Sequence, residues 1–192
     1  MDIKTRISHL FQLQEIQEIE NLNVNKVLEI GIGDGHLSSY LQRLDYDVTT
    51  VDIDKDKNPD IVADIRTYEP DDYDVICMFE ILEHIDYKEA LKVLEKMKNH
   101  AKYILISVPQ GRIYFDISIT FSGIKRLFGK HIASLHINFP LRSKSKGEHK
   151  WELNREVKRK QFRKMLKKNF TILKEYKVPL NSYHTIFVLR SN

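Results

Sequence analysis

The chain has 192 residues, of which 42% are hydrophobic and 30% are charged, an ordinary balance for a soluble globular protein. A chain of this length can bury a full hydrophobic core, so a single domain over residues 1–192 is expected. No apolar run approaches the roughly 20 residues of a membrane span, and the first residues lack the apolar block of a signal peptide, so a cytoplasmic protein is expected. The single cysteine excludes an internal disulfide and a CxxC metal site, and the formal net charge of +4 permits anionic partners without requiring them.

Residues 2–20 place apolar side chains at helical spacing ahead of the first strand. These positions are Ile3, Ile7, Leu10, Phe11, Ile16 and Ile19. The spacing predicts an amphipathic helix whose apolar face packs inward. Such a helix fits two roles, a cover over a ligand pocket or a layer that only covers the sheet.

The stretch Val27–Leu41, VLEIGIGDGHLSSYL, contains the most informative pattern of the chain. Residues 27–30 predict a short buried strand, and residues 36–44 carry helical periodicity. Three alternating glycines between the strand and the helix indicate a backbone that a ligand approaches closely. A nucleotide-like ligand over the helix N-terminus is the leading interpretation, and a glycine turn needed only for strand–helix packing is the alternative.

The spacing of the glycines and a neighbouring carboxylate indicate which ligand this is. A dinucleotide fingerprint, G-x-G-x-x-G, would place its third glycine at position 36, which is His36. Here the spacing is G-x-G-x-G, and Glu29 lies two residues before the first glycine. A carboxylate is a poor neighbour for a pyrophosphate, but it attracts a ligand that carries a sulfonium and an ammonium group.

The segment Glu29-Ile-Gly31-Ile-Gly33-Asp-Gly35 resembles the first motif of class I S-adenosylmethionine (SAM)-dependent methyltransferases, small prokaryotic type. The resemblance implies an α/β, doubly wound, mostly parallel seven-stranded sheet with an antiparallel last strand, the Rossmann-like class I fold. It also implies SAM as cofactor, S-adenosylhomocysteine (SAH) as product, and a leading helix that often covers the cofactor pocket. The cofactor-binding residues expected from this motif are Glu29, Gly31, Ile32, Gly33 and Gly35.

Residues 47–52 predict a second strand that ends on Asp52. Asp52 follows Gly31 by 21 residues, close to the roughly 20 expected for an acidic residue that binds ribose hydroxyls. We favour Asp52 over Asp54 for this role, and Ile53 between them is assigned to the same site.

A short third strand at residues 61–63 leads into Asp64 and Ile65. The family resemblance implies that Asp64 contacts the adenine amino group and that a flanking apolar side chain, here Ile65, covers the ring. The alternative is that Asp64 is a surface turn residue.

Residues 73–79 form a near-continuous apolar run, typical of a central parallel strand buried on both faces. The segment Phe79-Glu80-Ile81-Leu82-Glu83-His84 resembles the LEH segment after the fourth strand of many small-molecule class I methyltransferases, so Phe79 and Glu80 are expected at the cofactor site. The Asn/Asp-Pro-Pro-aromatic segment of N6-adenine and N4-cytosine enzymes is absent, which argues against those chemistries. His84 is a candidate general base, or else caps the next helix or binds a water.

After a helix at 87–99 and a strand at 102–108, residues 110–150 interrupt the alternation of strands and helices. This connection is long, so it is expected to be functional, an insert or lid between the fifth strand and the following helix. Three interpretations remain open: a lid that forms the acceptor site, a basic amphipathic segment on a membrane surface, and a structural flap.

The segment Gly147–Glu152, GEHKWE, resembles a G-E-H-x-W-E segment of a group of small prokaryotic class I enzymes. If the segment is strand-like, His149 and Trp151 point the same way, toward the methyl group of the cofactor. The alternative is a Trp buried under the insert and a His149 bonded to backbone. Two His and two Glu without a settled geometry are weak support for a metal, so no metal ligand is predicted.

Residues 154–168 predict a strongly basic helix, whose charged side is either a solvated face or a nucleic-acid contact. Residues 170–178 and 185–190 then predict two strands that pair antiparallel through a short connection.

Together these patterns predict a SAM-dependent methyltransferase that moves a methyl group to an oxygen or nitrogen nucleophile of a small-molecule or lipid- or glycan-type acceptor. The enzyme would contribute mainly positioning and a water-poor pocket, with His149 and then His84 as candidate catalytic bases. An RNA methyltransferase that uses the basic insert and helix, and a non-catalytic SAM-binding protein, remain alternatives. Peripheral membrane contact stays open, and the sequence predicts no oligomeric state.

Overall fold

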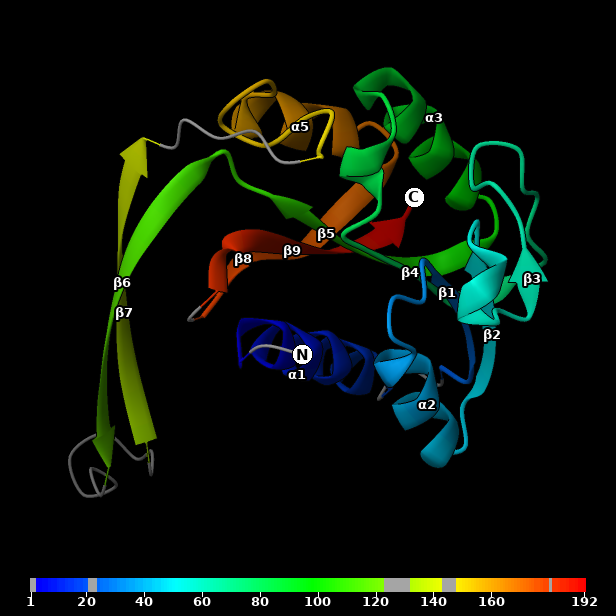
Figure 1. Cartoon of the computed structure of the whole chain (residues 1–192), viewed down its shortest axis with the longest axis horizontal. Helices are drawn as coiled ribbons and strands as arrows, with labels where there is room; N and C mark the ends of the chain where they lie inside the picture. The colour runs from blue at the N-terminus through cyan, green and yellow to red at the C-terminus, as the bar shows by residue number, and fades with distance from the viewer. Residues whose placement is uncertain (1–2, 21–23, 123–131, 143–147, 180) are drawn as a thin grey trace.

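A computed structural model describes residues 3–20, 24–122, 132–142, 148–179 and 181–192 of the chain. Seven of its strands form one sheet, in the order β3-β2-β1-β4-β5-β9-β8 (Figure 1). The bounds of these strands are β1 Lys26–Ile30, β2 Asp47–Asp52, β3 Ile61–Val62, β4 Tyr73–Phe79, β5 Ala101–Pro109, β8 Phe170–Val178 and β9 Asn181–Ser191.

Strands β1 to β5 run parallel, and β9 is antiparallel to both of its neighbours, β5 and β8. The predicted fold, a doubly wound mostly parallel sheet with an antiparallel last strand, is therefore confirmed. Chain order reverses between β1 and β4, which lie side by side in the sheet. In open α/β sheets this is the place where the carboxyl ends of the strands leave a crevice for a ligand.

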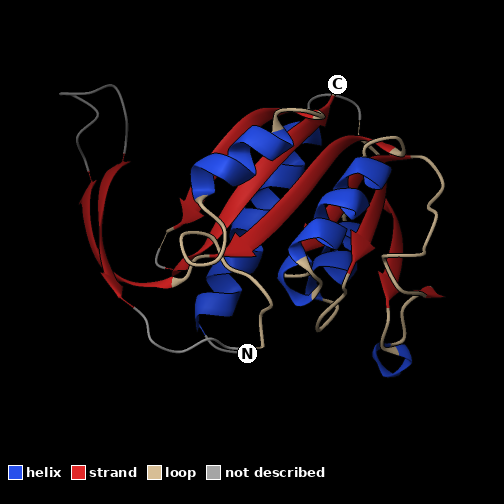
Figure 2. Cartoon of the chain, turned by 90° about the horizontal axis from the view of Figure 1, so that it is seen from above, coloured by secondary structure: helices blue, strands red, loops and turns tan. Residues whose placement is uncertain are grey.

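Helices cover both faces of the sheet (Figures 1 and 2). Their bounds are α1 Ile3–Glu20, α2 His36–Arg43, α3 Tyr87–Met97 and α5 Arg159–Leu166, with short 3₁₀ helices η1 Lys55–Lys57 and η2 Leu82–His84. Helices α1 and α2 lie on one face, and α3 and α5 lie on the other. None of the helices in the described ranges is long and apolar enough to span a membrane.

Strand β4 shows why the sheet is buried on both faces. Ile76 and Met78 belong to the core beneath α3 and α5, whereas Val75 and Cys77 belong to the core beneath α1 and α2. All four side chains are fully buried. Alternate residues of a strand point to opposite faces, so a continuous apolar run fills both cores.

Helix α1 differs from the amphipathic helix that the apolar spacing predicted. Leu10, expected to face inward, has 65% of its surface exposed. The buried side chains of the helix include the polar residues Ser8, Gln12 and Glu15 beside Ile16. The reason is the partner surface: polar groups of β8 and β9 bind this face, with Tyr176 donating to Glu15 over 2.9 Å.

The segment predicted as an insert or lid contains a two-stranded hairpin, β6 Arg112–Ser122 and β7 Ile132–Arg142. The two strands pair antiparallel along their whole length, from Arg112 opposite Arg142 to Ser122 opposite Ile132. The hairpin extends away at one side of the molecule (Figures 1 and 2). Its role as a lid, a membrane contact or a flap stays a prediction, as does the single-domain organisation.

The basic helix predicted at residues 154–168 is shorter, because α5 begins only at Arg159. Before it, Asn154 takes a left-handed backbone conformation with φ of 63°, and its N–H donates to the carbonyl of Val157 over 2.8 Å. A left-handed residue and this turn are incompatible with a continuous right-handed helix.

Candidate functional site

The turn after β1 is held open by backbone geometry. Gly31, Gly33 and Gly35 have φ angles of 80°, 55° and 71°, a region that side-chain-bearing residues adopt only with strain. A Cβ atom at Gly33 or Gly35 would meet nothing within 4 Å, whereas one at Gly31 would overlap the side chain of Ile81. The turn therefore presents bare backbone beside free space, and α2 starts directly after it.

A cavity of about 680 Å³ lies at this turn, at the carboxyl ends of the parallel strands. Most of the predicted site residues line it: Glu29, Gly31, Ile32, Gly33, Asp52, Ile53, Asp64, Ile65, Phe79, Glu80 and His84. Gly35 lies outside the lining, at the N-cap of α2. His149 also lies outside it, with its ring centroid 5.1 Å from that of His84.

Glu29 gives the cavity a buried carboxyl group. The residue is 5% exposed, and its Oε2 atom has no hydrogen-bond partner within the part of the chain that the structure describes. Burial, with a smaller contribution from the nearby Asp34 and Asp52, raises the pKa of this carboxyl to about 7 despite its hydrogen bonds with Ser38. A buried carboxylate oxygen without a hydrogen-bond partner is costly, so the site is suited to a cationic ligand that would pair with Oε2 of Glu29.

Asp52 is fixed at the end of β2. Its Oδ2 atom accepts from the N–H of Ile32 over 3.1 Å and faces Lys57 Nζ at 3.3 Å, while Oδ1 accepts from the N–H of Asp54 over 2.9 Å. The carboxylate is thus oriented by backbone donors on both sides. Asp54, the weaker candidate for this position, instead caps η1 by accepting from the N–H of Asp56 over 3.0 Å.

Asp64 and the apolar residues around it form another wall of the cavity. Arg66 Nε donates to Asp64 Oδ2 over 2.9 Å, and this guanidinium holds the pKa of the Asp64 carboxyl below its usual value. Ile65 is 7% exposed, but Ile53 is 69% exposed at the cavity edge. An exposed isoleucine beside a carboxylate is suited to a flat ring that carries an amino group.

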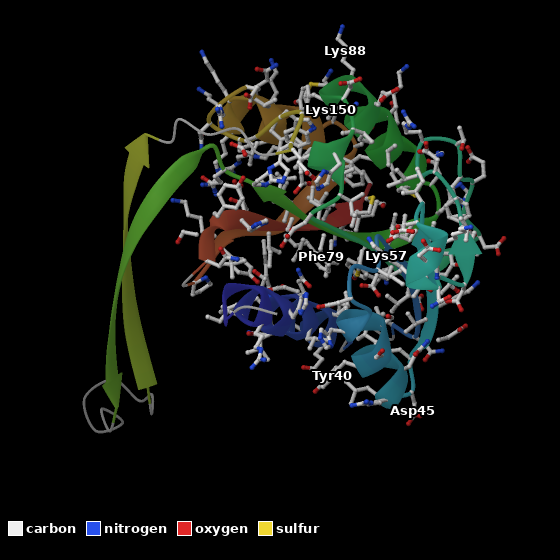
Figure 3. The ribbon with its side chains drawn as sticks, viewed as in Figure 1. Tyr40, Asp45, Lys57, Phe79, Lys88 and Lys150 are labelled. Carbon is white, nitrogen blue, oxygen red and sulfur yellow. The ribbon has the colours of Figure 1, made fainter. Side chains whose placement is uncertain are left out.

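The wall beside the glycine turn is formed by the end of β4 and the residues after it. Glu80 has a φ of 59°, a strained conformation for this residue type. Its N–H donates to Ser107 Oγ over 3.0 Å, and its Oε1 atom lies 3.4 Å from Nδ1 of His184. Phe79 of this wall and Lys57 of η1 are labelled in Figure 3, and both line the cavity.

Behind this wall lies a cluster of titratable side chains around His149. Glu152 Oε1 accepts from the hydroxyl of Tyr183 over 2.6 Å and lies 3.2 Å from His149 Nδ1. Burial would raise the pKa of Glu152, but the hydrogen bonds from Tyr183, His149 and Arg155 outweigh it and hold that pKa below its usual value. Burial and the neighbouring His149 lower the pKa of His84, which favours a neutral imidazole.

The segment that carries His149 is docked on η2. The N–H of Lys150 donates to the carbonyl of Glu83 over 2.8 Å, and the indole of Trp151 donates to the carbonyl of Leu82 over 3.0 Å. Trp151 is buried in the core beside Tyr87 and α5. His149 and Trp151 therefore lie in different surroundings, against the expectation from strand alternation, because residues 149–151 are not part of a regular strand.

Several cavity-lining residues were not identified from the sequence. Among them are His9 and Gln12 of α1, Lys57, Arg66 and Lys150. Lys57 and Arg66 follow the carboxyl ends of β2 and β3, so the rule that located Asp52 and Asp64 would also have found them. No local pattern marks His9 or Gln12, because α1 reaches the cavity only by packing across the folded sheet.

Comparison with known proteins identifies the family of this arrangement. Residues 4–167 match the family model described as a methyltransferase domain. No curated protein sequence matches the chain. Among solved structures, the magnesium protoporphyrin IX methyltransferase of Synechocystis PCC 6803 with bound SAH is 16% identical with a TM-score of 0.67, over 99% of this chain and 84% of that one.

Two further structures show the same fold. The N-methyltransferase NodS of Bradyrhizobium japonicum, in complex with SAH, is 14% identical with a TM-score of 0.60, over 99% of this chain and 88% of that one. The small RNA methyltransferase HEN1 is 18% identical with a TM-score of 0.62, over 98% of this chain but only 25% of that one.

Proposed function

The chain belongs to the class I SAM-dependent methyltransferases, and we propose that it binds SAM in the cavity at the glycine turn and methylates a small-molecule acceptor. The observation that carries this proposal is the buried carboxyl of Glu29, whose Oε2 atom has no hydrogen-bond partner among the described residues, in the same cavity lining as the open turn at Gly33. Two of the structural neighbours above hold SAH.

In this proposal different walls of the cavity bind different parts of the cofactor. Glu29 and the bare backbone of Gly31 and Gly33 hold the cationic methionine end, because a carboxylate and close-packed peptide groups suit an ammonium. Asp52 accepts from the ribose hydroxyls with the lone pairs that its backbone donors leave free. Ile53 packs on one face of the adenine ring and Ile65 on the other. Asp64 accepts a hydrogen bond from the amino group of adenine.

When bound, SAM supplies an electrophilic methyl group on its sulfonium sulfur. The chain then has to place a nucleophile in line with that methyl and exclude water. We assign the side of the cavity formed by Glu80 and His84 to the acceptor, because it holds polar groups beyond those that the cofactor requires. A neutral imidazole at His84, with His149 behind it, can accept a proton or bind a cation there.

Calorimetric titration with SAH, with NAD as control, tests the cofactor assignment. We expect micromolar binding of SAH and none of NAD. Transfer of a labelled methyl group from SAM to a low-molecular-weight cell extract, separated from RNA, then tests the acceptor class. SAH binding without transfer to any fraction would favour a non-catalytic SAM-binding protein.

An RNA acceptor is the second candidate, and α5 and its ends are the observation that favours it. Five lysines there are exposed: Lys158, Lys160, Lys164, Lys167 and Lys168. If they bind RNA, affinity should fall steeply with salt because each phosphate contact releases counterions. A flat salt dependence, or methyl transfer confined to the small-molecule fraction, would exclude this candidate.

A further inference from the structure

Three possible metal ligands meet beside the cavity, of which His84 lines it and Glu83 and His149 lie behind its wall. Glu83, His84 and His149 each offer a carboxylate oxygen or an imidazole nitrogen, and these atoms all lie within 4.8 Å of one another. The first two residues belong to η2, and the third is brought against them by the docking of Lys150 and Trp151 on that helix. Among the described residues no other group of this kind is found.

The carboxylate of Glu83 needs a partner that the protein does not supply. Its side chain is completely buried, and neither carboxylate oxygen has a hydrogen-bond partner within the described ranges. Buried polar groups are nearly always satisfied, and an unpaired buried carboxylate is among the most costly. The nearby carboxylates of Glu80 and Glu152 add to the negative potential at Glu83. A cation between Glu83 and the two imidazoles would satisfy all three side chains.

His149 is held as a metal-binding histidine is usually held. Its Nδ1 atom lies 3.2 Å from Glu152 Oε1 and 3.1 Å from the hydroxyl of Tyr183. With Nδ1 so engaged, Nε2 is the nitrogen left for a ligand. Metal-bound histidines typically donate their second ring nitrogen to a carboxylate in this way, which orients the ring and raises its basicity.

We propose that Glu83, His84 and His149 form a binding site for a divalent first-row transition-metal ion beside the methyl-donor cavity. Two imidazoles and one carboxylate suit such ions, and three protein ligands leave coordination positions open. Because His84 also lines the cavity, an ion held by these three residues would be next to a molecule bound there. The sequence predicted no metal and treated the two histidines as bases; in this assignment they are ligands.

The open positions indicate a substrate class, an inference that rests on the proposed function. An acceptor that carries an oxygen nucleophile would bind the ion directly, which fixes its position relative to the methyl donor. The metal site itself is independent of that inference, since it requires neither SAM nor an acceptor.

Metal binding to the chelator-stripped full chain tests the site. We expect one Mn²⁺, Co²⁺ or Zn²⁺ ion per chain by calorimetry, with a rise in Tm and, for Co²⁺, a visible absorption band from mixed nitrogen and oxygen ligands. Glu83→Gln and His149→Asn should each weaken binding at least tenfold. His100→Asn is the matched control, because His100 lies at the other end of β4, where it pairs with Asp72 at 3.4 Å. This variant should bind the ion as tightly as wild type does.

Absence of stoichiometric binding, or equal affinity in wild type and both site variants, would overturn the proposal. Binding of Mg²⁺ alone would overturn the assignment to a transition metal. Glu83→Gln is nearly isosteric and keeps the buried volume. His149→Asn changes a different residue, so if one variant fails to fold, the other still tests the site. A parallel SAH titration separates the two proposals: SAH binding without metal binding removes only the metal site, and the reverse removes only the cofactor assignment.

Discussion

The indole Nε1 of Trp151 donates a 3.0 Å hydrogen bond to the carbonyl oxygen of Leu82. This bond ties the segment that carries His149 to η2, which carries Glu83 and His84. The only tryptophan of the chain therefore acts on the site through the position of its neighbours, because it is buried in the core and does not line the cavity.

Trp151→Phe should lower stability by roughly 1–3 kcal/mol, since the Leu82 carbonyl loses its indole donor inside the protein. It should also weaken metal binding at the Glu83, His84 and His149 site. Tyr87→Phe is the matched control: Tyr87 packs 5.2 Å from Trp151 between ring centroids, and its hydroxyl has no partner within the described residues. Urea unfolding of both variants checks this, and equal losses would contradict the role of the indole bond.

Glu29→Gln should change the pH dependence of stability. The pKa of Glu29 is raised from 4.5 to about 7 in the folded protein, so between these values the folded state holds a proton that the unfolded chain has released. The free energy of unfolding contributed by this group therefore falls as pH rises through that window. The free energy of unfolding of the variant, relative to that of wild type, should therefore rise by on the order of 2–3 kcal/mol between pH 5 and pH 8.

Urea unfolding at the two pH values measures this gain, and the exposed Glu95→Gln of α3 is the control that should show none. The same variant should weaken SAH binding more at pH 8 than at pH 6, because only the ionised carboxylate attracts the ammonium of the ligand. A gain that is absent or reversed would show that Glu29 is not the buried acid of this cavity.

Gly33→Leu should remove SAH binding while the chain stays folded. Its Cβ would project into free space in the cavity lining, so the larger side chain would occupy cofactor volume. The φ of 55° costs any non-glycine residue roughly 1–2 kcal/mol. Gly33→Ala shares this strain with little added volume, so calorimetry should show a much smaller loss for Ala than for Leu. Unchanged affinity in the leucine variant would refute the cofactor assignment.

Lys174→Met should loosen α1 from the sheet. Lys174 Nζ donates to Glu15 Oε2 over 2.8 Å and also pairs with Glu18, and Glu15 is buried. Because the Glu15 carboxylate then has fewer hydrogen-bond donors, the free energy of unfolding should fall by roughly 1–3 kcal/mol. Hydrogen exchange of α1 should speed up, and SAH should bind more weakly because His9 and Gln12 of this helix line the cavity.

Lys167→Met, at the exposed C-cap of α5, is the control and should leave both measurements unchanged. Unaltered exchange in the Lys174 variant would mean that apolar contacts such as those of Ile16 hold α1 by themselves.

Local patterns determined the sheet and the residues at the glycine-turn side of the cavity. The apolar run of β4, the glycine turn after β1 and the spacing from Gly31 to Asp52 each depend on residues close in sequence, so strand period and turn chemistry were sufficient. The same local rules placed Asp64 and Ile65 at the carboxyl end of β3.

Only the tertiary structure decided the cluster around Glu83, His84 and His149 and the packing of α1. Leu10 is exposed and Glu15 is buried because the groups that meet α1, Lys174 and Tyr176, come from the far end of the chain. His149 joins Glu83 and His84 for the same reason. A side chain's burial and partners depend on contacts between distant segments, and no periodicity within one segment encodes those contacts.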